Sequence, residues 1–376
     1  TFTVRAESGD GQTAQRTLRI EVAAPFQTLS AGELISCGVA MTGGASCWGE
    51  NAAGALGNGT NGNSNVPVLV SGGLAFQSVS AGYRHTCGVT TTGAAYCWGG
   101  NANGELGNGN GSYAASNIPV AVSGGLTFRS VAAGGTHTCG VTTAGAAYCW
   151  GGGGYGSLGD SANTNSNVPV PVSGGFTFQS VDAGGYHSCG VTTTGAAYCW
   201  GNGYEGELGD SSNYGRNVPV LVSGGLSFIS VATGNFHSCG MTTTGTVHCW
   251  GWNRFGQLGD GTNVDSNVPV LVSGGLTAQS LRIGSGFGCV VTTVGAAYCW
   301  GYNLDGELGN GANTDTNLPV AVAGELTFQS VDPGHSATCG VTATGTAYCW
   351  GRNVYGELGD GTGADSNVPV VVVQVP

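Results

Sequence analysis

The sequence predicts an all-β protein, a seven-bladed β-propeller of four-stranded blades preceded by a short β-hairpin. Three observations favour this fold class. A pair of cysteines, the second followed by Trp-Gly, recurs seven times in 376 residues, at intervals of 50 with one interval of 52. Repeats of this length are typical of propellers and other repeat arrays, and seven four-stranded units can close into a ring. Helix signals are almost absent, whereas 40% hydrophobic residues with regular aromatics indicate a packed β structure.

Residues 1–24 lie outside the repeat. The segments TFTVRAES and TAQRTLRIEV read as two strands around Gly9-Asp10-Gly11, and Ala-Ala-Pro follows as a linker. This hairpin resembles the end of an immunoglobulin-like bacterial surface domain. Because an isolated hairpin is marginal in water, we expect its apolar residues to be buried against the propeller, an upstream domain or another chain. The chain begins at Thr1 without a leader, so we expect a processed product or a fragment.

Each repeat contains four strand-like segments, which in the second copy are FQSVSAG, HTCGVTT, AAYCWG and NVPVLV. Alternation along a strand puts Tyr96 and Trp98 on one face and Cys97 on the other, so that the aromatic rings fill the space between neighbouring blades. We predict that the propeller spans residues 25–376, with blades at 26–75, 76–127, 128–177, 178–227, 228–277, 278–327 and 328–376. Whether the ring closes within one blade or by a borrowed terminal strand stays open at this point.

The cysteine spacing can be read as hairpin register. Thr91-Thr92-Gly93 suits a three-residue hairpin loop, and pairing outward from it sets Cys87 opposite Cys97. The same register sets Tyr96 across from Gly88, where its ring can cover the glycine. The predicted disulfides use all 14 cysteines and are Cys37-Cys47, Cys87-Cys97, Cys139-Cys149, Cys189-Cys199, Cys239-Cys249, Cys289-Cys299 and Cys339-Cys349.

The alternatives to disulfides are zinc ligation and free thiols. The short C-x2-C spacing of zinc sites is absent, and no histidine stands at a regular offset from both cysteines, so we predict no metal site there. Closing a loop of about ten residues stabilises the fold by roughly 2.7 kcal/mol in the chain-entropy model. Seven disulfides indicate an oxidising compartment, and we expect an extracellular or cell-surface location, in a bacterium.

Residues 26–376 resemble the regulator of chromosome condensation repeat family. The second copy carries this resemblance in Ala81-Gly82 with His85, in the hairpin just described, in the WG-x-N-x-x-GELG segment from Trp98 to Gly107, and in Pro119. The resemblance implies a seven-bladed propeller, and it implies a fold more firmly than a function. Family members include a nuclear exchange factor for a small GTPase, plant photoreceptors and secreted inhibitors of β-lactamase. Paired cysteines, acidity and the lack of a wedge-like insertion separate this chain from the nuclear member, so we do not expect GTPase exchange or chromatin binding.

Charge and composition exclude several functions. The chain has 21 acidic residues, 9 arginines, no lysine and a net charge of -12, which makes nucleic acid a poor partner. No run of 18 apolar residues is present, so we expect no membrane insertion. Absence of lysine removes P-loop and Schiff-base chemistry. The glycine pattern at 151–156 matches the sequence motif of dinucleotide-binding sites but not its structural context, because it follows a hairpin strand and opens no helix. We predict no enzyme, no catalytic residues and no cofactor.

Three recurring polar positions have both a structural and a functional interpretation. Four histidines share one repeat position and could surround the channel, but apolar residues replace them in the other copies, which favours a structural histidine bonded within its own blade (His85, His137, His187, His237). Segments such as 260–267 have the alternating oxygen ligands of a calcium loop, but Asx-turns explain them as well. The recurring glutamates are interpreted as structural hydrogen-bond partners, since glutamine replaces one of them (Glu105, Glu207, Glu307, Glu357, Gln257).

The positions that differ between repeats around the WG-x-N-x-x-G turn form the strongest candidate for a binding rim. Aromatic residues and arginine gather there in one sector, as in binding hot spots, whereas blades 1 and 2 have small residues. The alternative is that these side chains only cover the channel or a neighbouring blade. The candidate rim consists of Tyr155, Tyr204, Trp252, Arg254, Phe255, Tyr302, Arg352 and Tyr355.

Three functions follow as hypotheses. The first is a secreted or cell-surface, non-catalytic binding or adhesion module that takes a protein or glycan partner outside the cell. The second is a structural subunit that binds copies of itself and builds an extracellular filament through the hairpin at residues 1–24. The third, an enzyme inhibitor, rests on family precedent alone.

Overall fold

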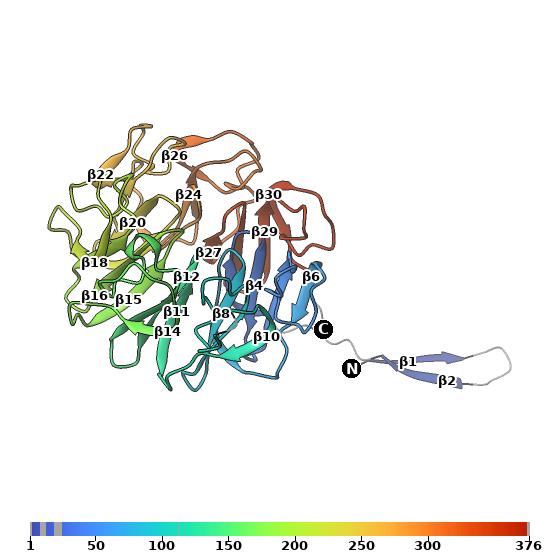
Figure 1. Cartoon of the computed structure of the whole chain (residues 1–376). Coiled ribbons are helices and arrows are strands. Elements are labelled where there is room, and N and C mark those ends of the chain that lie inside the picture. Colours follow the sequence, from blue (N-terminus) through green and yellow to red (C-terminus); the bar gives the residue numbers. More distant parts are fainter. Residues whose placement is uncertain (1, 8–12, 19–24, 112, 374–376) are drawn as a thin grey trace.

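The computed structural model describes residues 2–7, 13–18, 25–111 and 113–373. Seven four-stranded antiparallel sheets form the blades of a ring, which confirms the predicted fold class (Figure 1). A separate two-stranded sheet pairs β1 (Phe2–Glu7) with β2 (Thr13–Leu18), as predicted for the N-terminal hairpin. The side chains of this hairpin and residues 19–24 lie outside the described part, so what buries its apolar residues stays a prediction.

The first four blades are built from consecutive strands. Blade 1 contains β3 (Phe26–Ala31), β4 (Ile35–Ala40), β5 (Ala45–Gly49) and β6 (Ser64–Leu69). Blade 2 contains β7 (Phe76–Ala81), β8 (His85–Thr90), β9 (Ala95–Gly99) and β10 (Ser116–Ala121). Blade 3 contains β11 (Phe128–Ala133), β12 (His137–Thr142), β13 (Ala147–Gly151) and β14 (Ser166–Pro171), with the 3₁₀ turn η1 (Gly154–Gly156). Blade 4 contains β15 (Phe178–Ala183), β16 (His187–Thr192), β17 (Ala197–Gly201) and β18 (Arg216–Leu221).

The last three blades follow the same order. Blade 5 contains β19 (Phe228–Thr233), β20 (His237–Thr242), β21 (Val247–Gly251) and β22 (Ser266–Leu271). Blade 6 contains β23 (Ala278–Ile283), β24 (Phe287–Thr292), β25 (Ala297–Gly301) and β26 (Thr316–Ala321). Blade 7 contains β27 (Phe328–Pro333), β28 (Ala337–Thr342), β29 (Ala347–Gly351) and β30 (Ser366–Val371). No helix in the described residues is long and apolar enough to cross a membrane.

Up-and-down connection of four strands gives the ring two different faces. The turns between the first and second strands and the long loops between the third and fourth strands lie at one end of every blade, which we call the loop face. The tight turns between the second and third strands lie at the other end, the hairpin face. Residues that are far apart in the sequence but occupy equivalent loops therefore share one surface.

The predicted hairpin register and the disulfides are confirmed. In blade 2, Cys87 pairs with Cys97, Gly88 with Tyr96 and Val89 with Ala95. All seven cysteine pairs are disulfides, with Cα–Cα distances of 4.0 to 4.1 Å, and the described residues contain no free cysteine. The expectation that Tyr96 covers Gly88 is wrong, because a Cβ at Gly88 would lie 2.7 Å from the Phe76 ring, which already covers that position.

The core lies between the blades. Trp98 is fully buried against blade 1, in one cluster with Cys37, Cys47 and Leu56, and Tyr96 packs partly buried at the edge of the same cluster. The predicted alternation of aromatic and disulfide faces is therefore confirmed. The indole N–H of Trp98 also donates to the Ala55 carbonyl of blade 1 at 2.8 Å, so each interface combines apolar packing with a buried hydrogen bond.

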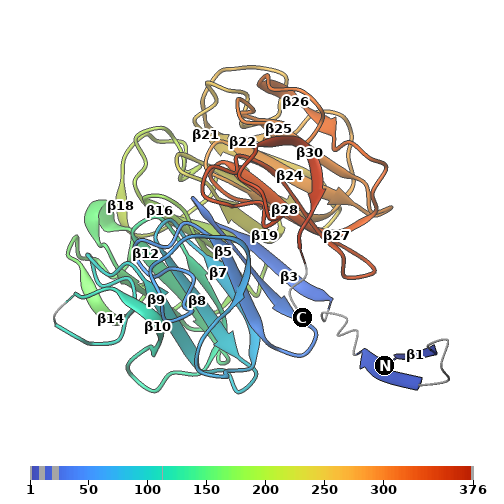
Figure 2. The ribbon, with the colours of Figure 1, turned by 90° about the vertical axis from the view of Figure 1, so that its right-hand side faces the viewer.

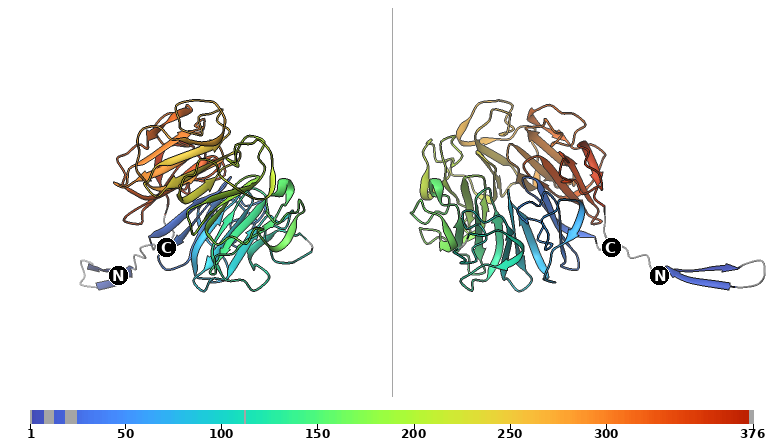
Figure 3. Two further views of the ribbon diagram at one scale, coloured as in Figure 1. Left: turned by 90° about the vertical axis from the view of Figure 1, so that its left-hand side faces the viewer. Right: turned by 45° about the vertical axis from the view of Figure 1, so that its right-hand side comes forward.

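Among the residues that the structure describes, no strand is exchanged where the ring closes, and blade 7 packs side to side against blade 1. Blade 1 and blade 7 each consist of four consecutive strands, and their sheets lie next to each other in Figures 1 and 2 and in both views of Figure 3. Trp48 donates to the Glu357 carbonyl at 2.8 Å, as the other tryptophans do at their interfaces. The N–H of His335 donates to the Gly32 carbonyl at 2.9 Å, which completes a circle of backbone contacts around the channel.

Candidate functional site

The long loops of the loop face are fixed by one buried asparagine in most blades. In blade 5, Asn253 Oδ1 accepts the N–H of Leu258 at 2.9 Å, and its Nδ2 donates to the carbonyls of Thr262 and Val264 at 3.2 and 3.1 Å. With both ends of its amide bonded to the loop, Asn253 holds the loop backbone in place. The side chains on either side of this asparagine, Trp252 and Arg254, make none of these bonds, and their positions vary between blades.

Blades 3 and 4 have glycine at this asparagine position. A Cβ at Gly153 would lie 1.9 Å from the Thr164 carbonyl oxygen, and one at Gly203 would lie 2.3 Å from that of Tyr214, so the returning loop takes the place of the amide. Tyr155 in this altered loop has φ 61° and ψ 4°. A bulky residue in the left-handed region is unusual and strained, and such strain concentrates at functional positions.

Aromatic side chains form a continuous row along the loop face from blade 3 to blade 6, which we call the aromatic arc. Neighbouring ring centroids are 5.2 to 6.3 Å apart, mostly edge to face. The two rings at the blade 3 and 4 end of the row are the most open, with Tyr155 57% and Tyr204 61% exposed. The arc consists of Tyr204, Tyr155, Tyr186, Phe236, Trp252, Phe255 and Tyr302.

The structure brings five of the eight predicted rim residues into the arc, and the other three lie on the same face. Arg352 stacks over the Tyr355 ring at 5.8 Å in blade 7, and Arg254 is exposed beside the arc in blade 5. Two arc members were not predicted, Tyr186 and Phe236, which come from the turns between the first and second strands. Their position also differs between repeats, as Arg84 and Thr136 show, so the same criterion would have found them.

The four histidines lie between blades rather than around the channel. In blades 2, 3 and 4 the buried Nε2 atom bonds a hydroxyl of the next blade, in the pairs His85–Thr138 at 2.8 Å, His137–Ser188 at 2.7 Å and His187–Ser238 at 2.7 Å. The structural role is confirmed, but the predicted bond within one blade is wrong, because the hydroxyl belongs to the neighbour. Burial lowers the pKa of His85 to about 4 and that of the other three to about 3.

The recurring carboxylates are also used by the loops themselves. Asp260 Oδ1 accepts the N–H of Thr262 at 2.9 Å, which is the predicted Asx-turn. Glu207 Oε2 accepts the N–H of Glu205, and Gln257 Oε1 accepts the N–H of Phe255, both at 2.8 Å, so the predicted structural hydrogen bond is confirmed. Burial raises the pKa of Glu207 to about 7. These side chains are explained by the loop and give no reason to invoke calcium.

Fold and site together define a disulfide-stapled β-propeller with one aromatic face. A family model described as the RCC1-like domain matches residues 6–332, and models of the regulator of chromosome condensation (RCC1) repeat match residues 329–357 and 344–376. The chain belongs to the RCC1-like domain family. A comparison with curated proteins finds no match.

Solved structures show the same fold at low sequence identity. Human WBSCR16 has a TM-score of 0.80 at 23% identity, over 87% of this chain and 94% of that chain. Prp20p of Saccharomyces cerevisiae, described with its binding to Gsp1p and histones, has a TM-score of 0.77 at 21% identity, over 93% and 87%. The CRINKLY ectodomain of the Arabidopsis thaliana receptor kinase ACR4 has a TM-score of 0.56 at 19% identity, over 92% and 99%.

Proposed function

We propose that this propeller is a secreted or cell-surface binding module, without catalytic activity, that holds a protein partner on its aromatic arc. Seven disulfides support an oxidising location outside the cell. Related propellers support protein binding as the family's kind of function, since a yeast RCC1 structure contains bound Kap60. The low identity to that structure means that neither Kap60 nor a GTPase is proposed as the partner here.

The continuity of the arc is the observation that carries this proposal. A ring needed only for packing would be buried, yet Tyr155 and Tyr204 are more than half exposed. Tyrosine, tryptophan and arginine are the residues enriched in protein-binding hot spots, and Arg254 and Arg352 lie beside the arc. Half-buried neighbours fix the exposed rings in place, so little side-chain entropy is lost when a partner binds.

A binding experiment with matched variants tests the proposal. Wild type, the triple variant Tyr155→Ala/Tyr204→Ala/Trp252→Ala and a control variant are cross-linked to native partners in the extracellular fluid of the source. The control carries Met41→Ala/Val294→Ala on the hairpin face, where Met41 and Val294 are 70% and 80% exposed. We expect one partner to be cross-linked to wild type and control and lost from the triple variant. Equal cross-linking to the triple variant would exclude the arc.

A second candidate function is assembly through the N-terminal hairpin, as in a bacterial surface filament. Within the described residues, β1 and β2 pair only with each other, and a two-stranded sheet is marginal alone. Pairing with a second copy would complete such a sheet. Particle mass and electron microscopy of the chain with and without residues 1–24 test this, because filaments that persist without the hairpin would exclude it.

A further inference from the structure

The channel of the ring is a cavity of about 650 Å³ lined by the first strand of every blade. One position of that strand differs strongly between blades, and in chain order it holds Ser30, Ser80, Ala132, Asp182, Ala232, Arg282 and Asp332. A serine at this position accepts a hydrogen bond from the backbone of the next blade, as when Ser30 Oγ accepts the N–H of Ala81 at 3.0 Å. The charged members therefore stand in a layer of small and hydroxyl side chains.

Tyr83 closes the channel at the loop face. Its ring reaches from blade 2 across the mouth, with its hydroxyl 3.4 Å from Ser285 Oγ of blade 6 and its ring edge to face with His335 of blade 7. Space for the ring comes from Gly135, where a Cβ would lie 3.1 Å from the Tyr83 ring. The lumen is thus a blind pocket that opens at the hairpin face, where the first strand begins Phe-Gln or Ala-Gln in five of the seven blades, and it is separate from the aromatic arc.

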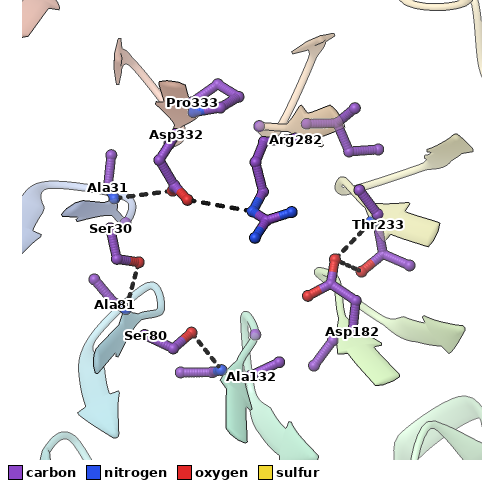
Figure 4. Close-up of a pocket in the computed structure, with 18 of the residues that line it drawn as sticks. Ser30, Ala31, Ser80, Ala81, Ala132, Asp182, Thr233, Arg282, Asp332 and Pro333 are labelled. Carbon is purple, nitrogen blue, oxygen red and sulfur yellow. Dashed lines mark hydrogen bonds and ion pairs between the residues drawn. The ribbon is translucent and has the colours of Figure 1, made fainter. Parts of the chain in front are cut away.

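Arg282 extends into the centre of the lumen between two carboxylates. Figure 4 shows its guanidinium between Asp332 on one side and Asp182 on the other. The Nε atom is 3.6 Å from Asp332 Oδ2, which is an ion pair too long for a strong hydrogen bond. At the junction of blades 6 and 7 this bond from side chain to backbone cannot form. Arginine accepts no hydrogen bond, and Pro333, which occupies the donor position in blade 7, has no N–H to donate. The Arg282 side chain is accordingly 57% exposed in the lumen.

The layer has hydrogen-bonding capacity left over for a ligand. Ser30 and Ser80 each accept an N–H of the next blade at 3.0 Å, and each hydroxyl still has its own proton to donate. The guanidinium has five donors, of which Nη1 uses one on the Leu281 carbonyl at 2.9 Å. Asp182 accepts the N–H and hydroxyl of Thr233, and each of its carboxylate oxygens has two lone pairs. Donors and acceptors thus face each other across one small space.

Charge decides what kind of molecule fits this space. An anion beside Arg282 would also face Asp182 and Asp332, and a cation beside either carboxylate would face Arg282. Burial raises the pKa of Asp332 to about 6 and also raises that of Asp182, which brings the layer closer to neutrality. A neutral molecule that both donates and accepts hydrogen bonds meets neither repulsion.

We propose that the blind lumen binds one small neutral polyhydroxylated molecule, a monosaccharide or a cyclic polyol. Its neighbouring hydroxyls accept the forked donors of Arg282 and the protons of Ser30 and Ser80, and they donate to Asp182 and Asp332. The ligand enters from the hairpin face and ends against Tyr83. This site is independent of the partner proposed for the aromatic arc, and either can fail without the other.

Ligand-observed NMR and calorimetry on the full chain test this site. The neutral probes are D-glucose, D-galactose and myo-inositol, and sodium acetate and putrescine serve as anionic and cationic probes. We expect one neutral probe to bind at one site per chain, and neither ion to bind there. Acetate or putrescine binding in the lumen without any neutral probe, or no neutral probe binding to wild type, would overturn the proposal.

Three variants locate the bound probe. Arg282→Met and Arg282→Lys should each weaken binding by about tenfold or more, since methionine has no donor and lysine keeps the charge but not the fork. Ser80→Ala should weaken it less, and the fold should tolerate it, because blades 3 and 5 already have alanine at this position. Tyr204→Ala on the arc is the control and should bind as wild type does. Equal affinity in all variants would place the probe elsewhere and contradict the proposal.

Discussion

The junction between blades 4 and 5 and the junction between blades 5 and 6 solve the same packing problem with different residues. At the first, His187 bonds Ser238 at 2.7 Å, and the Glu207 carbonyl accepts both Ser238 and Trp250 at 2.9 Å. At the second, Gly288 replaces the hydroxyl residue, so both nitrogens of buried His237 have no hydrogen-bond partner. Of the three bonds just described for the first junction, the second keeps the one from tryptophan to carbonyl, from Trp300 to Gln257, also at 2.9 Å.

Apolar packing also differs between the two junctions. Blade 6 has Ala278 where the other blades have phenylalanine, and Val290 where they have glycine. A cavity of about 120 Å³ remains beside Val290 and Trp300. The bond from tryptophan to carbonyl is present at all seven junctions, whereas the histidine, hydroxyl and phenylalanine are replaceable. The bond from tryptophan to carbonyl is therefore the contact of this set that every junction keeps, and the loop side chains of the arc take no part in it.

Acid should give the largest effect, through the histidine junctions. The folded-state pKa is about 4 for His85 and about 3 for His137, His187 and His237, below the unfolded value of about 6.5. In this range these four histidines bind more protons in the unfolded chain than in the folded one, so their contribution to stability is lost as pH decreases from about 6.5 to 4. Urea unfolding at a series of pH values measures this, and His187→Phe should lessen the loss. Since buried carboxyls act in the opposite direction over part of this range, the variant is compared with wild type at each pH. A difference in unfolding free energy between the two that stays constant from pH 7 to 4.5 would contradict the claim.

Buried carboxyl groups change stability in the opposite direction over an overlapping pH range. Burial raises the pKa of Glu307 to about 8 and that of Glu207 to about 7, above the unfolded value. Here the folded chain binds more protons, so stability falls as pH rises from about 4.5 to 8. Glu307→Gln should flatten this part of the pH dependence, which urea unfolding between pH 5 and 8 measures, and an unchanged slope in the variant would contradict it.

The packing difference at blade 6 should appear as coupling between two residues. Val290→Gly alone should destabilise by about 3 kcal/mol, because it enlarges an existing cavity. Adding Ala278→Phe should recover most of this loss, since a phenylalanine covers the equivalent glycine in blade 2. Urea unfolding of the two single variants and the double variant gives the interaction energy. Strictly additive effects would show that the two positions do not compensate each other.

The tryptophan bonds allow a sharper comparison of the two junctions. Trp300→Phe should destabilise more than Trp250→Phe by about 1 to 2 kcal/mol, because the buried Gln257 carbonyl then has no donor. The Glu207 carbonyl would still accept the hydroxyl of Ser238. Equal losses in the free energy of unfolding would mean that the carbonyl partner is unimportant.

Replacing the histidine by phenylalanine should change the free energy of unfolding in opposite directions at the two junctions. His237→Phe should stabilise by about 1 kcal/mol, because it removes two buried nitrogens without partners and Phe287 already occupies this position in blade 6. His187→Phe should destabilise by a similar amount, about 1 kcal/mol, through loss of its bond to Ser238. Thermal unfolding at pH 7 compares the pair, and the same sign for both would refute this reading of the blade 5 to 6 junction.

Structural features that lie within one blade and recur in every repeat could be predicted from the sequence. The spacing of Cys87 and Cys97 reflects two-residue alternation in a single hairpin, so its register could be predicted. Partners in the next blade could not, because the bond from His137 to Ser188 depends on how two sheets pack. The reach of Tyr83 across the channel to Ser285 depends on closure of the whole ring. The arc could be predicted only in part, because Tyr186 and Phe236 come from the turns between first and second strands, which the fold brings beside the long loops.

The most direct test of the central claim, that the aromatic arc is maintained for binding and not for folding, is the unfolding free energy of Tyr155→Gly. Tyr155 is 57% exposed and has a φ of 61°, a conformation that glycine adopts without strain. We predict that this variant is more stable than wild type by about 1 kcal/mol while its partner binding is weakened. A destabilised variant would show that the ring supports the fold, and the arc would then be packing rather than a binding surface.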